Sequence, residues 1–456
     1  MFNFYPSTLV RHTVGRKRTS LAKKRAQAFL EDSDLSLVES MQVALFNESW
    51  QSACNLPFYK DWKHRFNLPD FASNLEELRE WPILTKADLR ERIDLVEKTP
   101  GIVGSFRTSG STGEPFDFPR GEEDIAKNYT NMWSYRSAHG LQPFDPFLAV
   151  ANTLTGSAGS WWNQRKSSLA RSVKDILGNS WRTDGFIPTN ETADKALKNL
   201  KIMGARYIVG YPSGIASLAR RAEEMRLDFP QLTHAILTSE TVENTDIKLI
   251  ERAFQVTALV EYGAIELGAI AGSCNDYGGW PLKVHWWSHL MQLDEADSAL
   301  ISTLEPRIFP LINYAVGDMI VPERVTPGGS VFTIQQVLGR TRDTVTIETR
   351  DGEIKTVLAR GLSILVRDLP KVTSVQITQR QKGRVELLVV APGANQKELI
   401  SKMALAFSRN RKEFRPGSVT VAFIEQHVAS ARGKRGVFVD KISVPEHFET
   451  FSVIPK

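Results

Sequence analysis

The sequence predicts an α/β protein with two domains, a large N-terminal domain and a small α+β domain at the C-terminus. The chain has 456 residues, which is more than one hydrophobic core usually organises. Between residues 145 and 270, short apolar strands alternate with amphipathic helices, and after residue 339 the pattern changes to a hairpin, a helix and one more strand. We therefore expect a large domain over residues 1–338 and a small domain over residues 339–456.

The region before the alternating segment, residues 35–100, has the pattern of short helices joined by proline turns. Ser73-x-x-Glu76 and Thr85-x-x-Asp88 are candidate capping boxes. In such a box the hydroxyl and the acid satisfy N–H groups that the first helical turn leaves unpaired. A helix is therefore expected after each box.

The alternating segment predicts a mostly parallel sheet that helices cover on both faces. The helices expected there are Ile215–Met225 and Thr245–Phe254, beginning near Ser213 and Asn244. The buried strands are expected at Phe147–Ala151, Tyr207–Gly210, Ala235–Leu237 and Thr257–Val260.

The small domain is expected to contain a hairpin closed around Gly383. Glycine suits a tight turn because it adopts positive φ without steric cost. The elements predicted for this domain are strands Val372–Thr378 and Val385–Val390, helix Lys397–Phe407 and strand Val419–Glu425.

Composition excludes several classes of protein. The chain is 42% hydrophobic and 24% charged, as ordinary soluble globular proteins are, and its apolar runs are too short to span a bilayer. The two cysteines, Cys54 and Cys274, argue against a disulfide framework and suit a reducing cytoplasm. Cys274 and His285 offer at most two metal ligands, so packing is the favoured interpretation of both.

The N-terminus is basic, with seven Lys or Arg residues and no acid before Glu31. Such a segment suits a nucleic-acid arm, a membrane-surface helix or a transit sequence. A solvated face on a packed helix is the simpler interpretation. We favour it and expect no nucleic-acid partner, because the chain contains no RNA-binding or helix-turn-helix pattern.

One loop is rich in glycine and hydroxyl residues: Thr108, Ser109, Gly110, Ser111, Thr112 and Gly113. Glycine lets backbone N–H groups approach a polyphosphate closely and form an anion-binding nest. The loop is not the P-loop of nucleoside triphosphatases, because no G-x-x-x-x-G-K-[ST] pattern occurs and Glu114 follows Gly113. Taken alone, such a run is more often a surface loop.

Polar residues follow three of the predicted strands, at Tyr211–Ser213, Thr238–Glu240 and Glu261–Glu266. In open parallel sheets, ligands bind at the carboxyl ends of the strands. These segments are therefore expected to line a binding site.

Five motifs, in order along the chain, resemble those of the adenylate-forming superfamily, which includes acyl-CoA synthetases. They are Thr108–Gly113, Tyr262-Gly263-x-x-Glu266, Tyr314-x-x-Gly317-Asp318, the hinge Gly339-Arg340-Thr341-Arg342-Asp343, and Gly433-Lys434. The segment Leu78–Leu89 and the pair Ser239-Glu240 resemble the branch of phenylacetate–CoA ligases and capsular-polysaccharide CapK proteins. The resemblance covers nearly the whole chain and implies the adenylate-forming fold.

The resemblance also implies roles for single residues. Thr108–Thr112 would hold the β- and γ-phosphates of ATP, and Glu266 would help to bind Mg²⁺. The adenosine and the reacting groups would be contacted by Glu261, Tyr262 (stacking on adenine), Gly263, Asp318 (ribose hydroxyls), Arg340 (ribose or α-phosphate) and Lys434 (substrate carboxylate and α-phosphate).

The acid-binding pocket is expected near Trp133–Gly140. Its other predicted lining residues are Trp161, Trp162, Tyr211, Ser213, Ser239, Ala264 and Ile265. If Trp161 and Trp162 line this pocket, a flat aromatic acid fits it better than a long alkyl chain. The alternative for this tryptophan pair is simple core packing.

The function implied is that of an AMP-forming acid ligase, which activates a carboxylic acid with ATP and Mg²⁺ and passes the acyl group to a thiol, most simply coenzyme A. The alternatives are transfer to an amine, a sugar or a carrier protein, and a non-catalytic nucleotide-binding protein on the same fold. The chain departs from the superfamily at two positions. Glu114 stands where a lysine is frequent, and Arg342 stands where the hinge usually has Asp or Lys. The sequence specifies neither the acid nor the oligomeric state.

Overall fold

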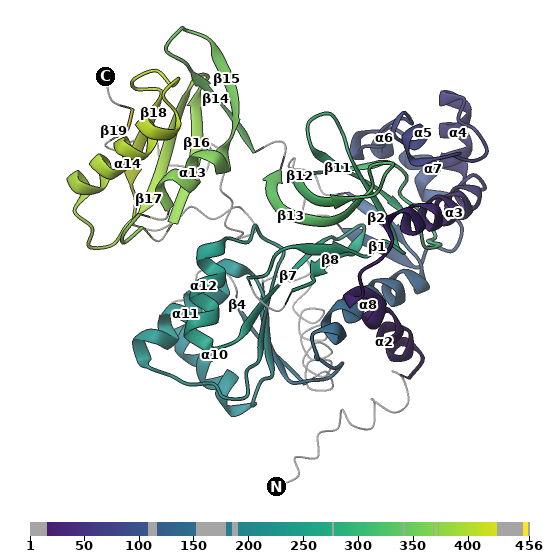
Figure 1. Cartoon of the computed structure of the whole chain (residues 1–456), viewed down its shortest axis with the longest axis horizontal. Coiled ribbons are helices and arrows are strands. Elements are labelled where there is room, and N and C mark those ends of the chain that lie inside the picture. Colours follow the sequence, from purple (N-terminus) through teal and green to yellow (C-terminus); the bar gives the residue numbers. More distant parts are fainter. Residues whose placement is uncertain are drawn as a thin grey trace, which may run out of the picture. The chain divides into compact units, whose positions relative to one another are not determined.

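The computed structural model describes residues 16–107, 116–151, 179–184, 190–275, 278–340, 343–367, 369–372, 374–425 and 450–454. The chain divides into two compact units, Met1–Val337 and Leu338–Lys456. Each unit has its own hydrophobic core. Figure 1 shows the elements of both.

Short helices precede the first sheet strands, as expected. They are α2 (Arg16–Leu30), α3 (Leu35–Ala53), α4 (Pro57–Phe66), α5 (Leu75–Arg79), α6 (Lys86–Glu91) and α7 (Ile93–Glu97). The capping box of Thr85 and Asp88 is confirmed at the start of α6. The box predicted at Ser73 is wrong by one residue, because Asn74 accepts from the backbone N–H of Glu77 at 2.8 Å and serves as the cap of α5.

The described part of the large unit is built on an 11-stranded sheet with the strand order β10-β11-β12-β13-β9-β8-β7-β6-β5-β3-β4. A separate hairpin of β1 (Gly104–Arg107) and β2 (Asp117–Arg120) leads into helix α8 (Glu122–Ala138). The strands are β3 (Phe147–Ala151), β4 (Ser180–Asp184), β5 (Tyr207–Gly210), β6 (His234–Thr238), β7 (Thr257–Ala264), β8 (Gly268–Ser273), β9 (Leu282–Val284), β10 (His289–Leu293), β11 (Ser298–Thr303), β12 (Tyr314–Val325) and β13 (Val331–Arg340).

The predicted parallel sheet is confirmed for β3, β5, β6 and β7, which pair in parallel with one another, and β4, which was not predicted, pairs in parallel with β3. Helices α10 (Asn190–Ile202), α11 (Pro212–Met225) and α12 (Asn244–Phe254) connect these strands. In Figure 1, α10 to α12 lie on one side of the parallel strands, and α8 with α2 lies on the other.

The rest of the sheet is antiparallel, so the whole is mixed rather than parallel throughout. Only residues 265–267 connect β7 to β8, and these two strands pair antiparallel. A connection this short cannot carry a parallel crossover, which needs a dozen or more residues. The direction of the sheet therefore changes at the turn that holds Glu266.

Helix α2 packs into the large unit through Ala22, Ala26 and Phe29, which are buried. The ammonium of Lys283 donates to the carbonyls of Phe29 and Glu31 at 2.7 Å each. It thereby satisfies acceptors that a helix C-terminus leaves unpaired. The favoured interpretation of the basic segment as a packed helix is confirmed for residues 21–30.

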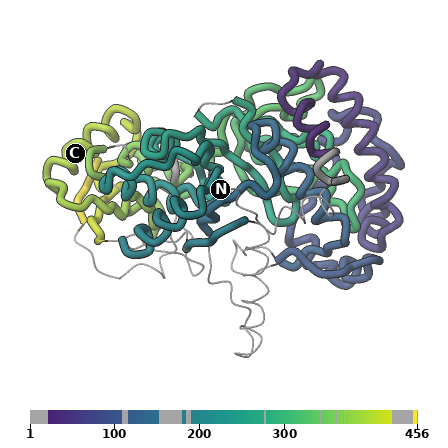
Figure 2. Tube along the Cα trace, turned by 90° about the horizontal axis from the view of Figure 1, so that it is seen from below, coloured from purple at the N-terminus to yellow at the C-terminus, as the bar shows by residue number. Residues whose placement is uncertain are grey.

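The small unit contains a four-stranded sheet and a separate two-stranded one among its described residues. Gly383 has φ +82° at the turn between β16 and β17, which confirms the predicted hairpin. The elements are β14 (Thr344–Glu348), β15 (Ile354–Leu358), α13 (Ala359–Arg367), β16 (Ser374–Gln381), β17 (Arg384–Val390), α14 (Gln396–Asn410), β18 (Val419–Phe423) and β19 (Phe451–Ser452). Figure 2 traces these elements in yellow-green and yellow.

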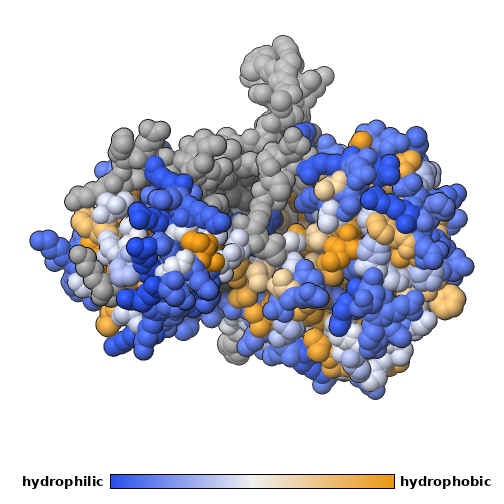
Figure 3. Space-filling view, turned by 90° about the horizontal axis from the view of Figure 1, so that it is seen from above, coloured by the Kyte–Doolittle hydropathy of each residue, from blue (hydrophilic) through white to orange (hydrophobic). Residues whose placement is uncertain are grey.

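Among the described residues, none of the helices combines the length and the apolar character that a bilayer span needs. Figure 3 shows hydrophilic side chains over most of the visible face of both units, with hydrophobic ones in small groups. The apolar side chains are mostly buried in the two cores, and this burial stabilises the fold of each unit.

His285 is a buried histidine in an aromatic cluster of the large unit. Its ring lies 5.4 Å from those of Phe29 and Trp287 and 6.5 Å from that of Tyr135. Burial, with a smaller contribution from the charge of Arg25, lowers the pKa of His285 to about 3. The favoured interpretation of His285 as a packing residue agrees with these contacts.

The pKa of His285 predicts a loss of stability in mild acid. Between about pH 3 and pH 6.5, the unfolded chain binds a proton at this site and the folded chain does not. The stability present above pH 6.5 is therefore lost as the pH falls. Urea unfolding should show that the wild type loses about 1.4 kcal/mol more than His285→Phe between pH 7.5 and pH 5.5. Equal losses in the two proteins would contradict the assignment.

Candidate functional site

Two segments that lie far apart in the sequence are joined by a pair of reciprocal hydrogen bonds. The hydroxyl of Tyr314 donates to Oε1 of Glu266 at 2.9 Å, and the hydroxyl of Tyr262 donates to Oδ2 of Asp318 at 2.9 Å. In each segment the tyrosine precedes the acid by four residues. Each tyrosine thus holds the carboxylate of the other segment, and all four side chains come together in the large unit.

The turn between β7 and β8 fixes the position of Glu266. A Cβ on Gly263 would lie 2.4 Å from the carbonyl oxygen of Gly268, so only glycine fits there. Arg307 donates to the carbonyls of Glu266 and Leu267 at 3.2 and 2.7 Å. The close approach of Gly263 to Gly268 and the hydrogen bonds from Arg307 therefore fix the backbone of the turn.

Lys86 is a member of this site that the sequence interpretation missed. Leu84 extends the sheet beside Tyr314, since its N–H donates to the carbonyl of Asn313 at 3.0 Å and its carbonyl accepts from Ala315 at 2.9 Å. Two residues later, the ammonium of Lys86 lies 3.2 Å from Oε1 of Glu266. The sequence held two signals: the capping box of Thr85, which fixes where α6 begins, and the resemblance of the segment Leu78–Leu89, which contains Lys86.

A small cavity of about 10 Å³ lies beside Glu266, lined also by Asp124, Arg307 and aromatic side chains. Asp124 is 5% exposed, and its Oδ2 accepts from the N–H of Gly121 at 2.6 Å. Its Oδ1 is buried and has no hydrogen-bond partner among the described residues. Two buried carboxylates therefore border one small space.

Glu261, predicted to contact the nucleotide, forms a buried ion pair. Nη2 and Nε of Arg136 lie 2.8 and 3.1 Å from its Oε2. Burial is the largest single influence on Arg136 and by itself would lower its pKa, but the charge of Glu261, the hydroxyls of Tyr135 and Tyr207 and the hydrogen bond to Glu261 together raise that pKa. The pair joins α8 to β7 one residue before Tyr262. A nucleotide contact by Glu261 stays a prediction.

The segment Trp133–Gly140, predicted near the acid pocket, forms the end of α8 and the residues after it, whereas the other described pocket residues lie at or next to the carboxyl ends of β5, β6 and β7. Ser213, in the first turn of α11, donates through Oγ to Oε2 of Glu240 at 2.7 Å. Ser239 follows β6 with φ +70°, which is rare outside glycine and typical of functional positions. Ile265 is 51% exposed. The other two, Tyr211 and Ala264, end or follow their strands.

Several predicted site residues lie outside the described residues, so their roles stay predictions. They are the loop Thr108–Gly113, Trp161, Trp162, the hinge residue Arg342 and Lys434. Arg340 is described as the last residue of β13, and its carbonyl accepts from the N–H of Asp343 at 2.9 Å.

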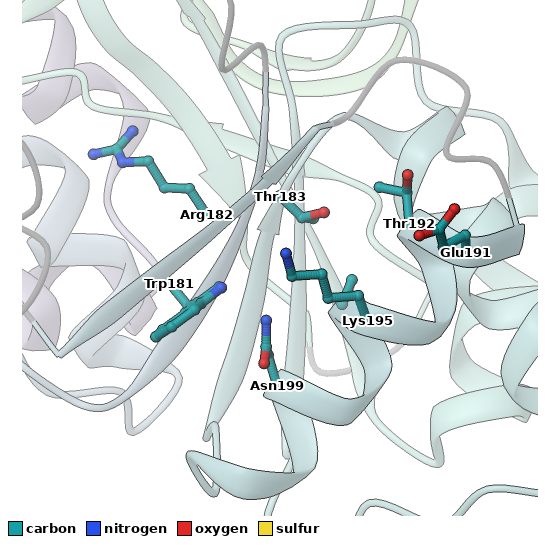
Figure 4. A pocket seen from close by; sticks show the side chains of 8 residues that line it. Trp181, Arg182, Thr183, Glu191, Thr192, Lys195 and Asn199 are labelled. Carbon is teal, nitrogen blue, oxygen red and sulfur yellow. The ribbon is translucent and has the colours of Figure 1, made fainter. Parts of the chain in front are cut away.

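A pocket of about 440 Å³ lies at the β4 edge of the sheet. Figure 4 shows Lys195 and Asn199 of α10 directed toward Trp181 and Thr183 of β4, whereas Arg182 points to the other side. None of the described residues predicted for the site lines this pocket. It is therefore distinct from the cluster around Glu266.

Breaking the ion pair of Arg136 and Glu261 should greatly lower the free energy of unfolding. Removing one partner of a buried pair leaves an uncompensated charge and costs about 3–5 kcal/mol. Arg136→Met should lower the free energy of unfolding by that amount in urea titrations. The double variant Arg136→Met/Glu261→Gln should recover part of the loss, and a loss below about 1 kcal/mol in the single variant would contradict the prediction.

Known proteins place these observations in context. No family model matches the chain. Its sequence is 19% identical over 404 residues to the CapK protein of Staphylococcus aureus, with 85% of this chain and 86% of that protein covered.

Solved structures of other proteins share the fold, and two of them illustrate it. A 2-hydroxyisobutyryl-CoA ligase in complex with 2-HIB-AMP, in the postadenylation state, aligns with a TM-score of 0.66 and 17% identity over 88% of this chain and 89% of that one. An acyl acid amido synthetase in complex with 2,4-DB aligns with a TM-score of 0.59 and 11% identity over 93% and 90%. This chain therefore has the fold of the adenylate-forming enzymes, and its sequence is similar to that of CapK, as its motifs indicate.

Proposed function

We propose that the protein is an AMP-forming acid ligase that activates a carboxylic acid with ATP and passes the acyl group to coenzyme A. The observation that carries the proposal is the reciprocal pairing of Tyr262 with Asp318 and of Tyr314 with Glu266. It gathers the acids of two separate motifs at one place. A chain with only the fold would need neither acid there.

Glu266 and Asp124 are the residues proposed to hold Mg²⁺. The described residues offer no cluster of three His, Cys, Asp or Glu side chains for a metal. Mg²⁺ is usually bound by one or two carboxylates together with the phosphates of the substrate. The unpartnered Oδ1 of Asp124 beside Glu266 fits that donor set. When bound, the ion would neutralise phosphate charge.

The other roles are positioning roles. The carboxylate of the acid attacks the α-phosphorus and pyrophosphate leaves, so the protein must hold the attacking oxygen in line and stabilise negative charge. We assign the ribose hydroxyls to Asp318, whose carboxylate Tyr262 orients, and the adenine to the ring of Tyr262. The triphosphate is assigned to Thr108–Gly113 and the developing charge to Lys434 and Arg340.

The acceptor is proposed to be the thiol of coenzyme A, and an amine is the second candidate. The solved relatives support both, because the 2-hydroxyisobutyryl-CoA ligase was also solved with 2-HIB-AMP and CoA, whereas the acyl acid amido synthetase is named for amide formation. Transfer to a sugar or a carrier protein and a purely nucleotide-binding role are further alternatives.

Pyrophosphate release over a panel of aromatic and aliphatic acids tests the proposal. Each acid is supplied with ATP and Mg²⁺, first alone, then with coenzyme A, then with amino acids. Release with one class of acid is the expected result, accelerated by coenzyme A. Acceleration by an amine alone would move the acceptor to the second candidate. No release with any acid would contradict the proposed activity.

Glu266→Gln should abolish most pyrophosphate exchange and leave the fold intact. The amide keeps the shape of the side chain and can still accept from Tyr314, but it carries no charge to balance a cation. We expect a thermal midpoint near that of the wild type with exchange lowered by at least about 10²-fold. Wild-type exchange in the folded variant would contradict the role of Glu266.

Lys434→Ala should separate the two half-reactions. We propose that residues 339–456 move as a body about the hinge at residues 339–343, so that Lys434 serves adenylation and then withdraws. The variant should lower adenylation by about 10²–10³-fold, the range for one charge-stabilising donor. Transfer from a supplied acyl-adenylate to the thiol should be unchanged. Equal damage to both steps would contradict the movement.

A further inference from the structure

The segment that links β1 to β2 carries the residues proposed to bind the triphosphate, yet it contains no positive side chain. From Thr108 to Pro115 it has no Lys or Arg, and Glu114 adds a negative charge. Hydroxyls and backbone N–H groups bind phosphate without neutralising it. Positive charge for a triphosphate bound there has to come from outside the segment, from Mg²⁺ and from side chains of other elements.

Helix α6 places such charge next to the end of this segment. Lys86 and Arg90, four residues apart, share one face of the helix. The ammonium of Lys86 lies 6.0 Å from the ring centre of Phe118, and the guanidinium of Arg90 lies 5.9 Å from that of Phe116. These two phenylalanines are buried; Phe116 directly follows the segment, and Phe118 lies two residues further on, in β2. The basic face of α6 therefore lies against the residues that follow the segment, Phe116 and Phe118.

The ammonium of Lys86 lies between the ring of Phe118 and the carboxylate of Glu266. Its side chain is 26% exposed, and its ammonium lies 3.2 Å from the nearly buried carboxylate of Glu266. Among the described residues, Glu266 is the one carboxylate within 4 Å of Lys86. A divalent cation bound at Glu266 would compete with the ammonium for the same oxygen. Phosphate oxygens of a bound nucleotide would offer the displaced ammonium a new partner.

We propose that Lys86 is a phosphate-binding residue that pairs with Glu266 in the nucleotide-free protein and with the β- and γ-phosphates when ATP is bound. This inference rests on the proposed function and identifies a ligand of the triphosphate beyond the motif residues. No covalent bond forms or breaks in the exchange. Lys86 distinguishes ATP and pyrophosphate from AMP, because AMP lacks the phosphates that it contacts.

The test is the affinity of Lys86→Met for ATP and AMP, measured by calorimetry with Mg²⁺, and the KM for pyrophosphate in exchange. Loss of one charge-assisted hydrogen bond should weaken ATP and pyrophosphate by about 10–100-fold. The affinity for AMP should stay within about twofold of the wild type, because the β- and γ-phosphates are absent. Lys86→Arg keeps the charge and should lose less.

Lys98→Met is the matched control, because Lys98 pairs with Asp94 on the surface of the same region. It should bind all three ligands as the wild type does. Unchanged ATP affinity in Lys86→Met would overturn the assignment, as would an equal loss for ATP and AMP, which would indicate a structural role through Glu266. A wild type that binds neither nucleotide would overturn the proposed function itself, and the assignment with it.

Discussion

The hydrogen bond between Tyr314 and Glu266 is the contact on which the rest of the site depends. It joins the turn after β7, where the sheet changes from parallel to antiparallel, to the start of β12. Leu84 forms a backbone bridge with Tyr314, and this bridge brings the start of helix α6 to the same place. Three segments, around residues 84, 266 and 314, therefore converge on one carboxylate, which is 8% exposed.

Charge balance explains why this point tolerates a buried acid. An isolated carboxylate with so little exposure would be costly, because burial removes its hydration. Lys86 supplies a positive partner and Tyr314 a hydrogen bond on the same oxygen. The neighbouring pair follows the same rule, with Arg136 buried and the side chain of Glu261 13% exposed. At the proposed nucleotide site, Glu266 and Glu261 are therefore each paired with a basic side chain.

The two units divide the proposed chemistry in a way that suits two steps. Glu266, Asp318 and Lys86 belong to the large unit, whereas Arg340 and Lys434 belong to the small one by their positions in the chain. Groups that must hold the nucleotide throughout are best placed on a rigid sheet. A charge that is needed in one step only is best placed on a part that can move.

The sequence by itself determined four of the parallel strands, the helices α11 and α12 and the small-domain hairpin, because these depend on local periodicity and on turn residues such as Gly383. It also singled out Glu266 and Asp318 as proposed site residues, because each stands in a short motif with fixed spacing. Only the tertiary structure decided which side chains meet these acids. Lys86 and Asp124, which lie beside Glu266, and Arg136, which pairs with Glu261, come from helices that no local pattern connects to β7 or β12. Strand order and packing decide which side chains become neighbours, and the spacing of residues along the sequence does not reveal these contacts.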